Sequence, residues 1–203
     1  MTATVPTGNT FDKYGSQNPV VRRLMAGFER TLDELFRQAL PGSILDIGCG
    51  EGVLTEQWAA RLGGGRVVGL DLEDAKLVGE WAARQRANLE FRSLDVTGGL
   101  PFADGEFDLV CATEVLEHVP GSERVVAEMA RVASRNLIVS VPHEPLWRCL
   151  NVARGAYLRE LGNTPGHINH WSRRGFVNLL SNHGEVVEVR SPFPWTMLLV
   201  RVA

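Results

Sequence analysis

The stretch Ile44-Leu45-Asp46-Ile47-Gly48-Cys49-Gly50-Glu51-Gly52 decides the fold of this chain. It begins as a short apolar run, continues into a glycine-rich turn, and is followed over residues 54–62 by apolar residues at helical spacing. Glycines let a turn adopt dihedral angles that other residues disfavour and let the backbone pass close to a ligand. The N-terminus of the next helix adds free N–H groups and the positive end of a dipole. The stretch therefore predicts a strand–turn–helix unit that holds a nucleotide-like ligand.

Short apolar runs continue to alternate with amphipathic stretches through residue 141. Strands that alternate with helices indicate βαβ units and a parallel sheet. Because the apolar runs are apolar on both faces, helices should cover both sides of that sheet. The predicted fold class is α/β with a Rossmann-like, mostly parallel sheet. The expected strands are residues 44–47, 67–70, 89–94, 107–111 and 137–141, and the expected helices are residues 54–62, 75–83 and 125–133.

The N-terminal flank is predicted to be an arm followed by a helix. Asn18 is a suitable N-cap, Pro19 stands in the first turn, and Pro41-Gly42 ends the helical pattern. Further on, residues 146–161 place apolar side chains on one face of a helix with arginines nearby, which is typical of an amphipathic helix covering the core.

The C-terminal flank is predicted to be one helix and a closing antiparallel hairpin. The helix starts at the N-cap Ser172 and ends at Gly184. Two strand-like runs, residues 185–191 and 195–202, then flank a proline-rich turn.

The composition is that of one globular domain of ordinary size. The chain has 203 residues, 44% of them hydrophobic, and a net charge of −3, which favours neither nucleic acid nor anionic lipid as a partner. Neither a secretory signal nor a run long enough to span a membrane is visible, so we expect a cytoplasmic protein without stable membrane insertion. Cys49 and Cys111 lie in or beside apolar strand runs and are expected to be small buried thiols.

The acidic residue before the glycines selects among nucleotide-like ligands. A dinucleotide site typically has G-x-G-x-x-G with a pyrophosphate at the helix end. This chain has G-x-G-x-G preceded by Asp46, whose carboxylate would repel a pyrophosphate. The same carboxylate suits a positively charged ligand, such as the ammonium and sulfonium of S-adenosylmethionine (SAM). Asp71 ends the next strand at the spacing typical of a ribose contact. Asp95 ends the third strand, where an adenine amino group could be recognised.

The ordered series of Ile44–Gly52, Asp71, Asp95 and Phe107-Asp108-Leu109-Val110-Cys111-Ala112-Thr113-Glu114-Val115-Leu116-Glu117-His118-Val119 resembles the class I SAM-dependent methyltransferases. It is most similar to the small-molecule branch that includes the ubiquinone and menaquinone biosynthesis methyltransferases. The resemblance implies SAM as cofactor, S-adenosylhomocysteine (SAH) as product, and a seven-stranded sheet with the last strand antiparallel. It implies that the segment matching Thr113 lies near the transferred methyl group. The residues it implies as cofactor-binding are Asp46, Gly48, Cys49, Gly50, Asp71, Leu72, Asp95, Val96, Thr113, Glu114 and Tyr14.

The same resemblance suggests how one domain spanning residues 1–203 is organised. The expected parts are an N-terminal arm and helix (1–42), a cofactor-binding core (43–141), a substrate lid (142–172), and a C-terminal helix and hairpin (173–203).

A catalytic base is not obvious from the sequence. In-line methyl transfer depends on positioning, and a base is needed when the acceptor must lose a proton. His143 follows the fifth expected strand at the ligand-bearing edge and is the first candidate, with His167 the second; for each, a packed or capping imidazole is the alternative. A metal site formed by His143, His167 and His170 has weak support from their spacing, and no metal is expected.

The acceptor is expected to be a small, partly apolar metabolite methylated at O or C by a monomer or homodimer. A base-methylating enzyme would carry an Asn/Asp-Pro-Pro-Tyr type element where this chain has Ala112-Thr113-Glu114-Val115, and a metal-dependent catechol type is disfavoured because no clear acidic cluster is visible. Two alternatives remain open: a nicotinamide-dependent oxidoreductase on a similar fold, and a SAM-binding accessory protein without catalysis.

Overall fold

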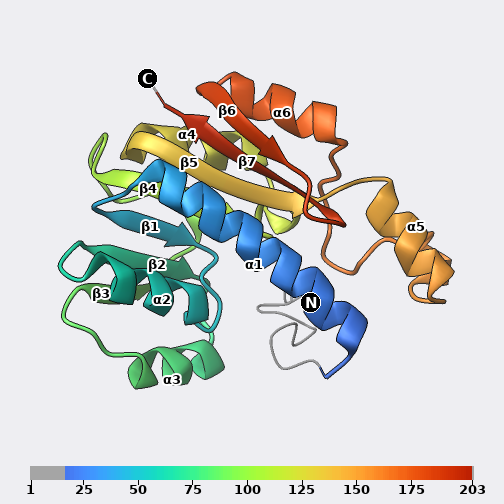
Figure 1. The fold of residues 1–203 in the computed structure, drawn as a ribbon, viewed down its shortest axis with the longest axis horizontal. Helices are drawn as coiled ribbons and strands as arrows, with labels where there is room; N and C mark the ends of the chain where they lie inside the picture. Colours follow the sequence, from blue (N-terminus) through green and yellow to red (C-terminus); the bar gives the residue numbers. More distant parts are fainter. Residues whose placement is uncertain (1–16, 203) are drawn as a thin grey trace.

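A seven-stranded sheet forms the centre of the computed structural model, which describes residues 17–202 (Figure 1). The strand order is β3-β2-β1-β4-β5-β7-β6. Strand β7 runs antiparallel to β5 and β6, and the other neighbouring pairs are parallel. The predicted fold class and closing hairpin are therefore confirmed. The strands are β1 (Ile44–Ile47), β2 (Val67–Asp71), β3 (Leu89–Ser93), β4 (Phe107–Thr113), β5 (Ala133–Pro142), β6 (Glu185–Arg190) and β7 (Trp195–Arg201).

Helices cover both faces of this sheet, as the doubly apolar strands predict. Side chains of α4 and α6 pack on one face, and those of α1 and α2 pack on the other. The helices are α1 (Pro19–Ala39), α2 (Val53–Leu62), α3 (Ala75–Ala83), α4 (Ser122–Val132), α5 (Leu146–Ala153) and α6 (Arg173–Ser181), with short 3-10 turns η1 (Val96–Gly98), η2 (Leu116–His118) and η3 (Leu158–Glu160). No helix within residues 17–202 combines the length and the apolar character that crossing a membrane requires.

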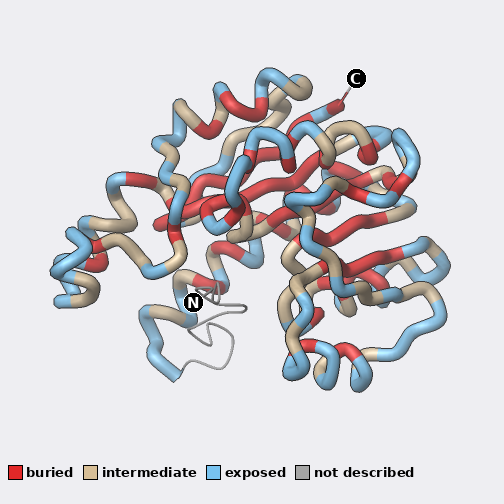
Figure 2. The backbone as a smooth tube through the Cα atoms, turned by 180° about the vertical axis from the view of Figure 1, so that it is seen from behind, coloured by how far each residue is buried: buried red, intermediate tan, exposed pale blue. Residues whose placement is uncertain are grey.

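The strands divide their side chains between two hydrophobic clusters, one on each face. In β5, Leu137 and Val139 belong to the cluster under α4 and α6, whereas Ile138 belongs to the cluster under α1 and α2. This alternation is the period of two that a strand imposes. The central strands are accordingly buried over most of their length (Figure 2).

Local signals in the sequence set most helix ends. The side chain of Asn18 accepts a hydrogen bond from the Val20 N–H, and the Ser172 hydroxyl oxygen accepts one from the Gly175 N–H, so both predicted N-caps are confirmed. The last helix ends at Ser181, however, and not at Gly184 as the pattern predicts.

Two predictions about element character are wrong. Residues 146–161 do not form one helix: α5 ends at Ala153, Tyr157 and Leu161 adopt left-handed backbone angles, and Leu161 is 71% exposed. The segment extends from the body of the protein beyond the end of β5 and does not cover the core (Figure 1). Strand β3 is not apolar on both faces, because it lies at the sheet edge, where Arg92 pairs with Glu90.

Candidate functional site

The glycine turn lies at the carboxyl end of β1, next to the switch point where the strand order reverses between β1 and β4. Gly48, Gly50 and Gly52 have φ values of 70°, 55° and 80°, in the left-handed region that favours glycine. A Cβ atom on Gly48 would lie 2.3 Å from a methyl carbon of Val115, which follows β4. The turn is therefore a close approach between two loops as well as a tight bend.

Asp46 is buried beneath this turn, with 3% of its surface exposed. The Thr55 hydroxyl on α2 donates a hydrogen bond of 2.6 Å to its carboxylate. Burial raises the pKa of Asp46 from 3.8 to about 7, and the nearby charge of Asp71 adds to the increase. The carboxylate is thus directed at Thr55, and it can influence a ligand above the turn through its charge without touching it.

Asp71, at the end of β2, fastens the turn in place. Its two carboxylate oxygens accept hydrogen bonds from the backbone N–H groups of Gly50 (2.7 Å) and Leu72 (2.8 Å). Burial raises the pKa of Asp71, although the two hydrogen bonds oppose that shift. Each carboxylate oxygen has a second lone pair, so further acceptor capacity remains. The indole N–H of Trp81 on α3 also donates to the Gly50 carbonyl at 2.8 Å. The sequence pattern does not reveal this contact, because the two residues are 31 positions apart.

The remaining predicted cofactor residues have mainly local partners. Asp95 accepts hydrogen bonds from the backbone N–H and hydroxyl of Thr97, caps the turn that begins at Val96, and has a lowered pKa because of these bonds. Cys49 is half-buried, and burial raises the pKa of its thiol. Cys111 is buried in β4, as predicted. Tyr14 lies outside the described residues.

Glu114 occupies an unusual position directly after β4. Its φ is 61°, which is uncommon for a residue with a side chain. One carboxylate oxygen accepts a hydrogen bond of 2.5 Å from the indole N–H of Trp195, and the other accepts one of 3.3 Å from the Ser140 hydroxyl. Glu114 therefore ties together the ends of β4, β5 and β7, next to Thr113. Sequence reasoning missed Trp195, because the partners are 81 positions apart.

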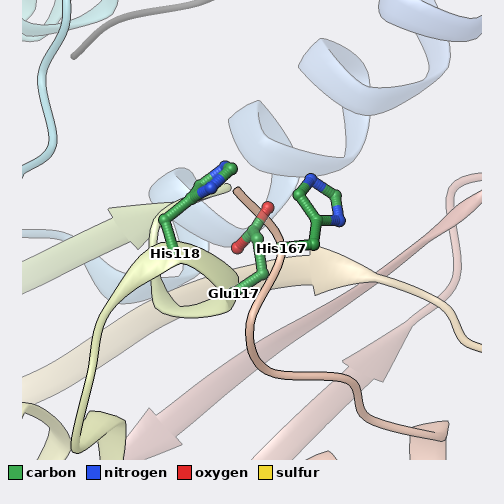
Figure 3. Close-up of side chains that lie close together, drawn as sticks. All are labelled: Glu117, His118 and His167. Atoms are coloured by element: carbon green, nitrogen blue, oxygen red, sulfur yellow. The ribbon is translucent and has the colours of Figure 1, made fainter. Parts of the chain in front are cut away.

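Two of the histidines come together with a glutamate at the same edge. Among the described residues, the His, Cys, Asp and Glu side chains close enough to share one ion are Glu117, His118 and His167, whose candidate ligand atoms all lie within 4.8 Å of one another (Figure 3). The combination of His143, His167 and His170, which has only weak support from its spacing, does not come together as one group among these residues. The backbone N–H of His143 donates to the Pro194 carbonyl, a bond that does not involve the imidazole. The catalytic role of His143 therefore stays a prediction.

Aromatic rings in contact with one another connect this histidine pair with Glu114. The Trp147 ring centroid is 6.2 Å from that of His167 and 5.9 Å from that of Trp195. The Trp147 indole N–H donates to the Thr164 hydroxyl at 2.9 Å, which holds the ring in place. The start of α5 thus supplies an apolar surface at the edge of the sheet where ligands bind in open α/β folds.

Comparison with known proteins shows what the chain is similar to. Residues 45–139 match a family model described as "Methyltransferase domain". Over 101 residues, the chain is 41% identical to a ubiquinone biosynthesis O-methyltransferase of Hahella chejuensis, a match that covers 48% of this chain and 41% of that protein. The chain therefore spans about two fifths of the length of the curated relatives it matches.

Solved structures share the fold over nearly the whole chain. The magnesium protoporphyrin IX methyltransferase of Synechocystis, solved with bound SAH, has a TM-score of 0.69 at 22% identity and covers 93% of this chain and 90% of its own. SpnF, a [4+2]-cyclase, has a TM-score of 0.67 at 13% identity and covers 98% of this chain and 87% of its own. The matched domain and the sequence relatives confirm the predicted resemblance to class I SAM-dependent methyltransferases and to the ubiquinone biosynthesis enzymes among them. The solved structures show that the chain has the same fold.

Proposed function

We propose that this chain transfers a methyl group from SAM to an oxygen or carbon atom of a small, partly apolar molecule. The observation that carries the proposal is the turn at the end of β1, where Gly48 and Gly50 form a cradle that Asp71 fastens from the neighbouring strand. The domain matched over residues 45–139 includes all of these residues. The names of the sequence relatives favour oxygen as the acceptor atom.

The geometry of the cradle fits SAM. A Cβ on Gly48 would clash with Val115, so the glycine lets the turn lie directly against the segment after β4, whereas the space beside Gly50 is open. The backbone N–H groups at the start of α2 and the acceptor capacity left on Asp71 suit the polar ends of the cofactor. The negative charges of Asp46 and Asp71 suit its ammonium and sulfonium groups. When bound, SAM supplies an activated methyl group.

This chain's own residues would position the acceptor and exclude water. Trp147 offers a partly exposed apolar ring, and the buried ring of Trp195 packs behind it and holds Glu114 through its indole N–H. Holding a nucleophile in line with the methyl carbon can contribute about 7–11 kcal/mol to a barrier reduction, so positioning alone accounts for much of such catalysis. His143 and His167 remain the proposed bases. A monomeric or homodimeric state, a cytoplasmic location and the absence of nucleic-acid substrates also stay predictions.

Binding of SAM, SAH and NADH to the purified chain tests the cofactor. Isothermal titration calorimetry should show SAM and SAH binding at one site and no binding of NADH. Replacement D71N should weaken SAM binding by at least about tenfold, because a hydrogen bond to a charged group contributes about 1.5–3 kcal/mol. Replacement D104N is the matched control, because Asp104 is an exposed carboxylate that forms an ion pair with Arg131. It should leave the SAM affinity unchanged. Binding of NADH alone would refute the proposal.

Turnover is tested by SAH release in the presence of a panel of phenols, hydroxylated quinone precursors and other hydroxylated metabolites. We expect SAH formation with at least one aromatic hydroxyl compound and a product heavier by one methylene unit. SAM binding without turnover on the panel would contradict the catalytic proposal and favour an accessory protein that binds SAM.

A further inference from the structure

Trp81 joins helix α3 to the glycine turn, residues 48–52. Helix α3 lies at the lower margin of the fold in Figure 1. The Trp81 side chain is nevertheless buried, with 8% of the residue exposed, and its indole N–H donates to the Gly50 carbonyl at 2.8 Å. A buried indole N–H requires a hydrogen-bond partner, and here that partner is the backbone of the turn assigned to the cofactor. A helix at the margin therefore acts directly on that turn.

Packing against Phe91 on β3 fixes the plane of this indole. The two rings are stacked, with centroids 5.3 Å apart and planes at 6°. The Phe91 ring itself lies against two glycines, because a Cβ atom on Gly52 would be 2.5 Å from a ring carbon and one on Gly69 would be 2.7 Å away. The ring therefore has little room to move. Since Phe91 holds the indole in one plane, the Trp81 N–H stays directed at the turn.

Gly50 is held at both of its backbone polar groups. Its N–H donates to the Asp71 carboxylate at 2.7 Å, and its carbonyl accepts from Trp81. Its φ is 55°, and a Cβ atom there would meet nothing within 4 Å, so packing does not restrict the residue. A glycine without such restriction adopts positive and negative φ values about equally readily. The two hydrogen bonds therefore provide the restraint that packing does not.

The bond to Trp81 also sets the direction of the next backbone N–H. The Gly50 carbonyl and the Glu51 N–H belong to one trans peptide group, so they point in opposite directions. With the carbonyl directed at α3, the Glu51 N–H points away from α3, and it donates to no other residue within the described range 17–202. An N–H group in this position, just before α2, suits an anionic group such as a carboxylate. A flipped peptide would present an acceptor there in place of a donor.

We propose that Trp81 is a positioning residue for the cofactor, because its indole N–H holds the Gly50 carbonyl and keeps the turn in its binding conformation before the cofactor arrives. This inference rests on the proposed function, since it takes the turn as the SAM site. Trp81 acts through Gly50 and makes no contact with SAM of its own. A turn that is ordered in advance removes the cost of ordering it from the binding step. Loss of the bond should therefore appear as a loss of SAM affinity.

Replacement W81F tests the bond, because it keeps an aromatic ring beside Phe91 and removes the indole donor. Calorimetry should show SAM and SAH affinities lower by about three- to tenfold, the range expected for one neutral hydrogen bond. W58F is the matched control, since Trp58 on α2 is 3% exposed and also stacks on a phenylalanine, Phe36, with centroids 5.8 Å apart. W58F should lower the free energy of unfolding without weakening SAM binding. Equal SAM affinity in W81F and wild type would overturn the proposal.

Hydrogen exchange followed by NMR tests the same bond without cofactor. In the free protein, the Gly50 amide should exchange at least about threefold faster in W81F than in wild type, and at an unchanged rate in W58F. F91L keeps the indole donor but removes the stacked ring, so it should lower stability and weaken SAM binding less than W81F does. Equal Gly50 exchange in W81F and wild type, or an equal loss of SAM affinity in F91L and W81F, would refute the positioning role. If wild type binds no SAM, the proposed function fails, and the exchange rates still decide whether Trp81 holds the turn.

Discussion

Replacing Asp46 with asparagine should change how the stability of the protein depends on pH. Burial raises the pKa of Asp46 to about 7 in the folded state, whereas its ordinary value is 3.8. The folded protein therefore holds this proton more tightly than the unfolded chain. The stabilising effect is fully present below pH 3.8 and declines as the pH rises to about 7. Asparagine keeps the shape and the oxygen that accepts from Thr55, but it does not ionise.

The size of the effect follows from the two pKa values. A difference of about 3 units corresponds to ~4 kcal/mol over the whole pH range, at 1.36 kcal/mol per unit. Between pH 5 and pH 8, about 2.5 kcal/mol of this change occurs. The free energy of unfolding of D46N, relative to wild type, should therefore rise by ~2–3 kcal/mol between these pH values. For a chain of this size, the Tm difference should grow by about 5–10 °C.

Urea denaturation and thermal melting of both proteins at pH 5, 6, 7 and 8, without SAM, measure this difference. Comparing the two proteins at each pH removes the contribution of all other titrating groups. Parallel stability profiles for D46N and wild type would refute the reasoning, because they would show that Asp46 does not change its protonation in this range. With SAM present, the cofactor's ammonium should favour the carboxylate, so wild type should gain more SAM affinity than D46N as the pH rises from 6 to 8.

Three further replacements test other contacts. G48A should lower the free energy of unfolding by about 1–3 kcal/mol and weaken SAM binding, because it adds backbone strain and a clash with Val115. G50A, with a φ of 55° but open space around it, should have a smaller effect, and equal effects of the two replacements would contradict the close approach. W195F keeps a ring but removes the donor to Glu114, so urea denaturation should show a loss of about 1–3 kcal/mol. N169A should lower the free energy of unfolding by about 1–3 kcal/mol, because the Asn169 amide donates to the carbonyls of Leu116 (2.9 Å) and Val119 (2.7 Å). An unchanged urea midpoint would show that these two bonds do not hold the loop before α6 against η2.

The parts of the fold that the sequence predicts are those specified locally. The N-cap at Asn18 and the apolar runs that became β1 and β5 need no knowledge of distant residues. Residues 146–161 do not form the single helix that their apolar spacing predicts, because Gly155, with a φ of 74°, breaks the backbone within that pattern. The exposure of one face of β3 could not be predicted locally, because its position at the sheet edge depends on the strand order.

The same distinction applies to the site. The sequence predicts Asp71 as a site residue from its place at a strand end, but not that its carboxylate binds the Gly50 N–H. It favours His143 by the strand-end rule, yet the histidine that joins a cluster is His167, 49 positions after His118 in the chain. Neither that cluster nor the contact between Glu114 and Trp195 has a spacing signal, because each joins segments that meet through the sheet order.

That sheet order explains why the proposed donor and acceptor sites are neighbours. The connections after β1 and β4 leave the sheet in opposite directions, which opens a crevice between adjacent strands at their carboxyl ends. Gly48 lines one side, and the segment from Glu114 to His118 lines the other, with Val115 filling the point of contact. Glu114, at the start of that segment, holds Trp195 on the side assigned to the acceptor. One short segment after β4 therefore joins both halves, so a shift in it should change SAM affinity and acceptor affinity together.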